Sequence, residues 1–481
     1  MTLLISLGSF LLGLFALRRI YQMERAAASV LFQLTFVCFF AQHVAFGFAP
    51  LLMAIFDQGY TYQNLQGIFL YSDGIVPLEM VNLVSIYAAL IGVRIAIIGR
   101  QPANRPQSML LSDDHNKSTS EVLPAQNQAL RMICYITLAL HAVVFGLQQV
   151  SLPAILLYLF QVITPMVAAT FYFWGLGWRQ AGRGRWVFIV YASVFGLTSL
   201  SAGGRGYFLI GVLLFFLGYL QAHDWRLPRR DLAMIALAAV SLLWLITISE
   251  NIRLLYRSRQ PANLQEWMTR GSQLLSGVGL GGQEVESFDY AVFRSAATMT
   301  LFSPLDVIAR TPQDVPYAGW SEDEWDLLFR GWFPAFGMRD IITAEIKGQL
   351  DVRDYGWVVD PTAPNPEDRN AAPMTFLADS WRRFGIIGIV VFPFILAVFL
   401  TRLSMLVEQS DHSIFRLIFG GSLVALIYYF SLWDILALVS YLPRRLLVCL
   451  IYTAVVYSVY LIHARLNRKL PSKSISVSRL P

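Results

Sequence analysis

Charged residues are scarce in this chain, and their scarcity excludes most soluble folds. Only 14% of the 481 residues are charged, whereas 56% are hydrophobic. A soluble globular domain has about 25% charged and about 45–50% apolar residues. We therefore predict an all-α polytopic membrane protein, because helices pair all their backbone groups internally and can cross a bilayer.

Motifs for nucleotides, metals and disulfides are also missing. The sequence has no Walker loop, no dinucleotide-binding glycine pattern and no His/Cys cluster with metal-ligand spacing. Its cysteines, Cys38, Cys134 and Cys449, lie inside apolar runs and are expected to be small core residues. We therefore expect no cofactor and no metal. The net charge of +6 does not indicate nucleic acid, because basic residues of membrane proteins gather in cytoplasmic loops.

Long apolar runs supply about eleven candidate spans, each near the roughly 20 residues that a membrane helix needs. They lie near 2–17, 27–48, 76–98, 129–148, 152–176, 186–200, 206–221, 231–249, 384–403, 413–432 and 443–462. The first run is followed, not preceded, by its basic residues, Arg18 and Arg19. It is therefore expected to be an uncleaved span, not a signal peptide.

Basic residues fall in alternate loops along the chain. Arginines occur directly after the first span and in the segments 99–128, 177–186 and 223–231, while the loop at 49–75 contains neither Lys nor Arg. The positive-inside rule then places the N-terminus outside and the C-terminus inside. We expect a bacterial cytoplasmic membrane protein of four parts. These are an N-terminal bundle (1–249), a large extracytoplasmic loop with short helices (250–382), C-terminal spans (383–463) and a cytoplasmic tail (464–481).

The large predicted loop is rich in arginine and contains a single lysine, Lys347. Arginine binds phosphate and carboxylate groups through two parallel hydrogen bonds, which lysine cannot do. For any one arginine, a salt bridge with a loop carboxylate is an equally good explanation. For the set as a whole, we expect an anionic ligand.

The stretch SAGGRGYFLIG places Arg205 among glycines, between two short apolar runs. Glycine lets a backbone approach a ligand closely. The helix expected to begin just after Arg205 would offer free N–H groups and the positive end of its dipole. Guanidinium and helix N-terminus together outline a diphosphate site. The alternative is an interfacial arginine that reaches toward the headgroups.

Two further stretches combine carboxylates with arginines. Glu250 stands at the end of the eighth predicted span, with Arg253 and Arg257 on the same helical face. An ion pair is favoured there over a general base. In MTFLADSWRRFGIIGIV, Asp379 and Arg382 stand beside Arg383 at the entry to the ninth span, where the alternative is an interfacial anchor. The acidic stretch SEDEWD is expected to be a solvated helix start and not an ion site.

These stretches resemble the Wzy-type polysaccharide polymerases, which extend O-antigen and exopolysaccharide chains. SLSAGGRGYFLIG is similar to the family's Ser/Gly-Arg-Gly segment before a short span, and the order of spans, large loop and spans also agrees. APMTFLADSWRRFGIIGIVVF is similar to the family's loop-to-membrane re-entry, with Phe384, Gly385 and Gly388 as its FG-x-x-G. Two departures are clear. RGWFPAFGMRD keeps Pro334 but lacks the family's Pro-Arg and Lys-Pro pair, and Asp379 stands where many relatives have Glu.

The resemblance implies metal-independent glycosyl transfer on the outer membrane face, joining repeat units carried by undecaprenyl diphosphate. Arg205 and Arg253 would stabilise the departing diphosphate, and Glu250 or Asp379 would accept the acceptor hydroxyl's proton. Substrate contacts would come from Tyr207, Arg257, Arg270, Arg294, Trp320 and Arg382. The implied partners are the lipid-linked oligosaccharide and membrane lipid, together with a flippase and a chain-length regulator.

Three other functions are considered. An O-antigen ligase shares the layout but typically uses an outer-loop histidine, which the loop 250–382 lacks. Another lipid-sugar glycosyltransferase would use Asp57 or Asp73 in the first outer loop. A transporter would explain the intramembrane charges Glu79, Arg94 and Asp434, although the chain shows no repeat symmetry.

Overall fold

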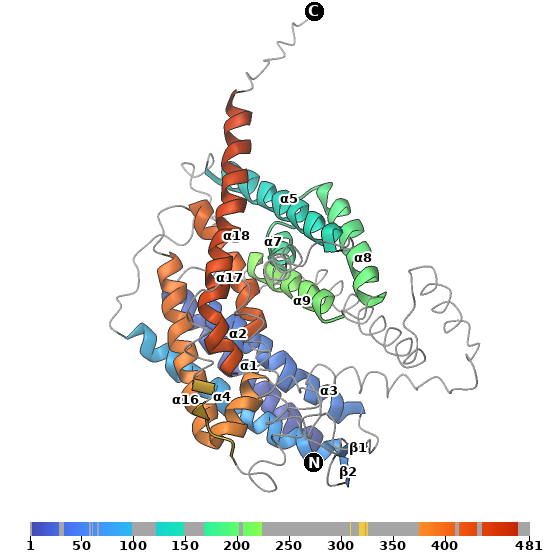
Figure 1. Cartoon of the computed structure of the whole chain (residues 1–481), viewed down its shortest axis with the longest axis vertical. Helices are drawn as coiled ribbons and strands as arrows, with labels where there is room; N and C mark the ends of the chain where they lie inside the picture. Colours follow the sequence, from blue (N-terminus) through green and yellow to red (C-terminus); the bar gives the residue numbers. More distant parts are fainter. Residues whose placement is uncertain are drawn as a thin grey trace, which may run out of the picture.

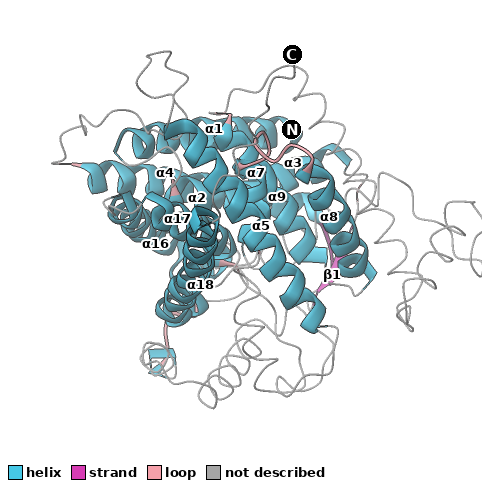
Figure 2. Cartoon of the chain, turned by 90° about the horizontal axis from the view of Figure 1, so that it is seen from above, coloured by secondary structure: helices cyan, strands magenta, loops and turns pink. Residues whose placement is uncertain are grey.

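The structure is a computed structural model. It describes residues 2–27, 33–56, 59, 61–64, 67–98, 122–148, 168–201, 205–223, 308, 317–322, 324–325, 375–408, 413–430 and 435–469. Helices dominate these residues, as the scarcity of charge predicts (Figures 1 and 2). The predicted helical class is therefore confirmed, with one small β-hairpin that was not expected.

The described helices follow the predicted apolar runs. They are α1 (Thr2–Ala27), α2 (Leu34–His43), the π-helical turn η1 (Val44–Phe48), α3 (Ala49–Phe56), α4 (Tyr71–Ile97), α5 (Val122–Gln148), α7 (Ala169–Leu176), α8 (Gly184–Ser201), α9 (Arg205–Ala222), α16 (Phe376–Glu408), α17 (Ser413–Phe430) and α18 (Ile435–Lys469).

Five helical segments are long and apolar enough to cross a membrane. They are Thr2–Ala27, Leu34–Phe56, Asp73–Ile97, Phe376–Glu408 and Arg445–Arg465. Shorter apolar helices cover Gln128–Val144, Gly184–Gly196, Ile210–Ala222 and Ile414–Ile427. Large apolar side chains on these helices are exposed, as at Leu4 (75%) and Ile387 (66%). Exposed apolar surface on this scale is typical of a membrane protein. The total of eleven spans stays a prediction, because 231–249 and most of 152–176 lie outside the described residues.

The second span lies further along the chain than its apolar run predicts. It covers Leu34–Phe56 in place of 27–48, and it contains the π-helical turn η1. Pro50 lies shortly after this turn and does not end the span. The apolar run alone therefore misplaces this span by about two turns.

Two groups of helices pack around α17. The helices α1, α2, α4 and α16 contact one another, and α7 contacts α5 and α9, while α17 touches both α2 and α7 (Figure 1). At the crossing of α7 and α9, Gly175 lies against the carbonyl oxygen of Phe215, and Gly218 lies against that of Tyr172. Small residues allow this close backbone approach, as is usual between membrane helices. The position of α9, which begins at Arg205, is fixed by this crossing.

The unexpected hairpin lies in the segment predicted as the first outer loop. Strand β1 (Thr61–Asn64) pairs antiparallel with β2 (Gly67–Leu70), with Thr61 opposite Leu70 and Asn64 opposite Gly67 (Figure 2). A two-residue connection is the usual one for such a pair. Since α4 begins at the next residue, the hairpin leads directly into the helix that carries Asp73 and Glu79.

Candidate functional site

The predicted loop-to-membrane re-entry is a broken helix. In α16 the residue Gly385 has φ 56° and ψ −135°, which interrupts the helical conformation after Phe384. This backbone conformation is essentially restricted to glycine. Three residues later, Gly388 lies against the carbonyl oxygen of Ser380, so the two halves of α16 touch where they cross. The FG-x-x-G pattern thus has a physical basis, because both glycines are needed for the break and the close crossing.

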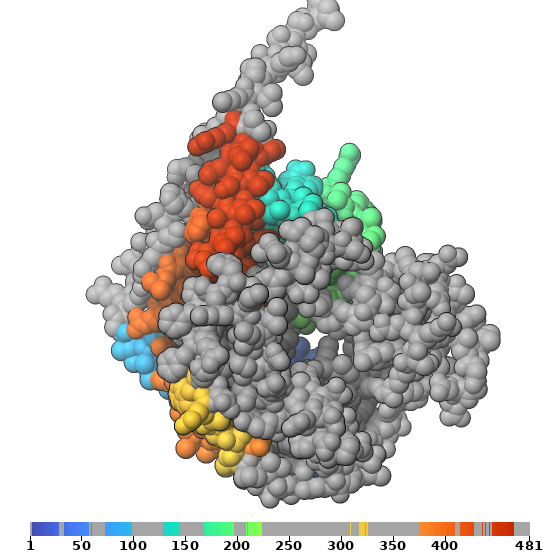
Figure 3. All heavy atoms as spheres, viewed as in Figure 1, coloured from blue at the N-terminus to red at the C-terminus, as the bar shows by residue number. Residues whose placement is uncertain are grey.

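A segment of the predicted outer loop binds at the break. Tyr317–Trp325 lies on the surface beside α16, about 60 residues away along the chain (Figure 3). The N–H of Ala318 donates to the carbonyl of Arg382 (3.0 Å), and the N–H of Gly319 donates to that of Arg383 (3.2 Å). Carbonyls at the end of a helix lack regular partners. The loop therefore supplies hydrogen-bond donors to two carbonyl groups that the break in α16 leaves without helical partners.

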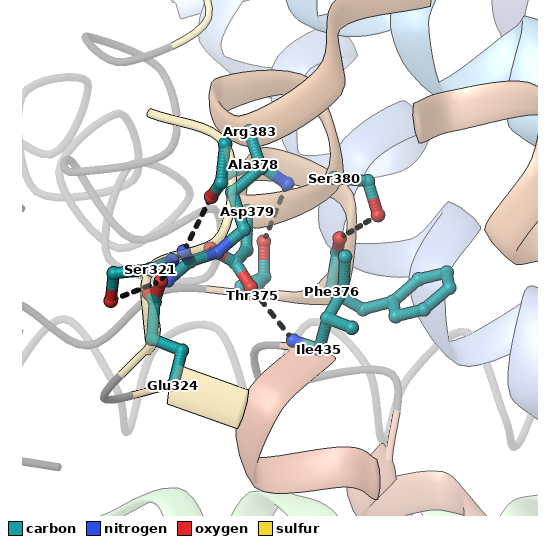
Figure 4. A network of polar contacts seen from close by, with 10 residues as sticks. Ser321, Glu324, Thr375, Phe376, Ala378, Asp379, Ser380, Arg383 and Ile435 are labelled. Carbon is teal, nitrogen blue, oxygen red and sulfur yellow. Dashed lines mark hydrogen bonds and ion pairs between the residues drawn. The ribbon is translucent and has the colours of Figure 1, made fainter. Parts of the chain in front are cut away.

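Arg383 joins three parts of the chain at this point. Its Nε donates to Oδ1 of Asp379 at 2.7 Å, and its Nη1 donates to the carbonyl of Gly319 at 3.0 Å and to Oε1 of Glu324 (Figure 4). The second oxygen of Asp379, Oδ2, accepts from the N–H of Ile435 at 2.9 Å, at the start of α18. The loop, α16 and α18 therefore meet on one guanidinium and one carboxylate. We call Arg383, Asp379 and Glu324 the anchor.

The anchor is almost fully buried. The side chains of Arg383, Asp379 and Glu324 are 3%, 0% and 1% exposed. The neighbouring side chain of Arg382 is also buried. Buried charges are tolerated when they are paired and hydrogen-bonded. With both oxygens of Asp379 engaged, the geometry supports the anchoring ion pair, and its role as proton acceptor stays a prediction.

The stretch SEDEWD forms the loop side of the anchor. Oε2 of Glu324 accepts from the N–H of Ser321 (2.6 Å) and from its hydroxyl (3.0 Å), and the first of these bonds is one half of a capping box. The expected helix start is therefore present. The expectation that it is solvated is wrong at Glu324, because the other oxygen of this buried carboxylate pairs with Arg383.

Trp320 packs against the membrane helix. Its ring centroid lies 4.7 Å from that of Trp325, 6.0 Å from that of Phe384 and 6.3 Å from that of Phe392. These contacts are those of a loop packed on α16. The more exposed aromatic side chains here are Tyr317 (45%) and Trp325 (47%), which the sequence does not single out. Trp320 as a sugar-binding residue stays a prediction.

The other predicted site residues are placed only in part. Arg205 is the first residue of α9, and Tyr207 lies in its first turn; the orientation of both side chains lies outside the described structure. Outside the described residues lie Glu250, Arg253, Arg257, Arg270 and Arg294. Asp379, Arg382 and Trp320 therefore lie in one region, at the break in α16, while Arg205 is placed only as the start of α9.

Two further findings concern metal ligands and known proteins. Within it, no group of three or more His, Cys, Asp or Glu side chains could hold a metal ion. No protein-family model, no curated protein and no solved structure matches this chain. The family resemblance therefore depends on the sequence motifs alone.

Proposed function

We propose that the chain is a glycosyltransferase of the bacterial cytoplasmic membrane that polymerises lipid-linked oligosaccharide repeat units into a surface polysaccharide. The observation that carries the proposal is the start of α9 at Arg205, four positions after the last residue of α8, Ser201. The first N–H groups of a helix lack internal partners, and the dipole is positive there. An arginine at this position adds a full positive charge to a terminus that already favours a diphosphate.

The anchor supports the same proposal from the other end of the large loop. It ties Tyr317–Trp325 to α16 and α18 through buried charges that are paired and hydrogen-bonded. A loop fixed at its return to the membrane can hold its arginines over the bundle at low entropic cost. In this proposal, the anchor positions the loop, and the arginines outside the described residues stabilise the departing lipid diphosphate.

Orientation and topology belong to the proposal. We propose about eleven spans, with the N-terminus outside, the C-terminus inside and 250–382 as the outer loop. The start of α1 and the end of α18 lie at opposite ends of the molecule (Figure 1), which supports an odd number of crossings.

Deletion of the gene and gel analysis of the surface glycan test the function. We expect single repeat units in place of a ladder, and we expect Arg205→Ala, at normal membrane abundance, to reproduce the loss. The matched control is Arg183→Ala, which removes an exposed arginine from the turn before α8 and should leave the ladder unchanged.

The outcomes separate the alternatives. Complete chains left on the lipid carrier would show a ligase. Repeat units that stay lipid-linked on the cytoplasmic side would show a transporter. A normal ladder with abundant Arg205→Ala protein would contradict the role of Arg205, and a normal ladder in the deletion strain would contradict the proposed function itself.

A further inference from the structure

A cluster of polar side chains is buried among α1, α2 and α4, away from the anchor. Its members are Ser6, Ser9, Gln42, His43, Glu79, Asn82 and Ser85, none of which is more than 6% exposed. The cluster lies within segments that are long and apolar enough to cross a membrane. Polar side chains at such positions are costly, and they face the bundle interior when they have a function.

Four members of the cluster form a chain of hydrogen bonds in which the donor and the acceptor of each bond can be assigned. Nε2 of Gln42 donates to Oδ1 of Asn82 (3.0 Å) and to Oγ of Ser85 (3.1 Å). The Asn82 amide nitrogen then faces Nδ1 of His43 (3.1 Å), and Nε2 of His43 faces the carbonyl of Phe10 (3.1 Å). A carbonyl only accepts, so Nε2 carries the hydrogen and Nδ1 accepts from Asn82. His43 is therefore held as a neutral ring.

The surroundings of His43 are built to hold this ring. Gly13 of α1 and Gly47 of η1 both lie against the imidazole, and a side chain at either position would collide with it. The π-helical turn η1 begins at the next residue, Val44. Such turns are frequent at functional sites. The polar chain is thus a rigid support next to Glu79, which with Ser6 and Ser9 completes the cluster.

Glu79 is the group that this network leaves unsatisfied. It is 1% exposed, and neither carboxylate oxygen has a hydrogen-bond partner among the described residues. The hydroxyl of Ser6 on α1 is the polar group that interacts with the Glu79 carboxyl. It is also buried, and no hydrogen bond of regular geometry joins it to a described residue. Glu79 lies one helical turn before Asn82 on the same face of α4.

Other buried acids in the described structure are satisfied. The two oxygens of Glu24 accept from the N–H groups of Thr35 (3.1 Å) and Phe36 (2.8 Å), at the start of α2. Asp379 is paired with Arg383. Glu79 has no ion pair with any described residue. Arg94 on its own helix, α4, is exposed, and so is Arg402 on α16, which packs against α4.

An isolated carboxylate in an apolar interior is too costly to remain bare. It must take up a positive charge, and the described side chains do not offer one. We propose that Glu79, with the Ser6 hydroxyl beside it, is an exchangeable binding site for one small monovalent cation, either a proton or a sodium ion. The proposal does not depend on the polymerase function, since it uses none of the residues assigned to that function.

Infrared spectroscopy of the full chain in lipid nanodiscs tests the site directly. The carbonyl stretch of a protonated carboxyl group is recorded for wild type and for Glu79→Gln, from about pH 5 to about pH 8, in choline chloride and in sodium chloride. We expect a protonated-carboxyl band in choline that is lost in Glu79→Gln. The matched control Glu24→Gln should keep this band, because Glu24 already has two hydrogen-bond donors.

Sodium then identifies the occupant. If the band disappears when sodium replaces choline, the site binds sodium in competition with the proton. If it is unchanged by sodium, the site holds a proton. Identical spectra of wild type and Glu79→Gln across the pH range in both salts would overturn the proposal. Thermal unfolding of Glu79→Gln, a change of nearly equal volume, verifies that the variant is folded.

Discussion

At the scale of single residues, the anchor makes Arg383 a position that tolerates little change. Arg383→Met would leave Asp379 and Glu324 buried without their cation. Breaking a buried pair by removing one partner costs roughly 3–5 kcal/mol. We therefore expect a large fall in the thermal unfolding temperature of the detergent-purified protein. The triple variant Arg383→Met, Asp379→Asn, Glu324→Gln should recover part of this loss, because the three anchor side chains are then all uncharged.

The control for this prediction is a second ion pair of the same chain, formed by an arginine and a glutamate. Arg416 donates to Glu408 at 3.2 Å, but their side chains are 23% and 26% exposed. Exposed pairs contribute about 0–1 kcal/mol. Arg416→Met is therefore expected to change the unfolding temperature little. Equal effects of the two substitutions would contradict the importance of burial at the anchor.

Sequence reasoning located one half of the anchor and missed the other. Asp379, Arg382 and Arg383 are predicted because they are adjacent at the edge of a strongly apolar run. Glu324 could not be identified, since four acids share SEDEWD and its partner is 59 positions away. The Ser-x-x-Glu spacing from Ser321 was visible as a capping box. It indicates a helix start, but it does not show which carboxylate is buried.

At the scale of elements, the break in α16 depends on Gly385. A Cβ at this position would lie 2.6 Å from the Tyr317 ring, in addition to the strain of φ 56°. Positive φ alone costs an L-residue about 1–2 kcal/mol. We expect Gly385→Ala to destabilise the protein by more than this and to release the Tyr317–Trp325 segment, which limited proteolysis can detect.

A control variant at a second glycine separates the effect of backbone strain from the effect of the collision with Tyr317. Gly182 has φ 53°, but a Cβ there would meet nothing within 4 Å. Gly182→Ala therefore carries the backbone strain without a collision and should lower stability by the smaller amount. If both alanine variants are equally stable and equally resistant to protease, the contact of Tyr317 with the break does not hold the loop.

Apolar runs predict where helices lie better than where they begin. The ninth span was expected near 384, but α16 begins at Phe376, because the half-helix FLADSWRR is too polar for a hydropathy window to include. Its polar side chains are buried by contacts with the distant loop and with α18. The π-helical turn and the hairpin were not predicted from the sequence either.

At the scale of the whole molecule, the proposed orientation can be tested with introduced cysteines. The native cysteines Cys38, Cys134 and Cys449 are all buried, so a membrane-impermeant maleimide should give little background. Two exposed positions lie on opposite sides of the bilayer in the proposed topology. They are Asp73 at the start of α4 and Arg183 before α8. We expect Asp73→Cys to react in intact spheroplasts and Arg183→Cys to react only after the membrane is permeabilised.

A third position makes the orientation test independent of the region between α5 and α8, where the span 152–176 is described only in its last third. Arg465→Cys, exposed near the end of α18, should behave like Arg183→Cys if the C-terminus is cytoplasmic. Labelling of Arg465→Cys and Asp73→Cys together in intact spheroplasts would place both ends of the chain on one side. An odd number of spans would then be wrong, and the loop 250–382 could no longer be assigned to the outer face, because that assignment depends on the count of crossings on either side of it.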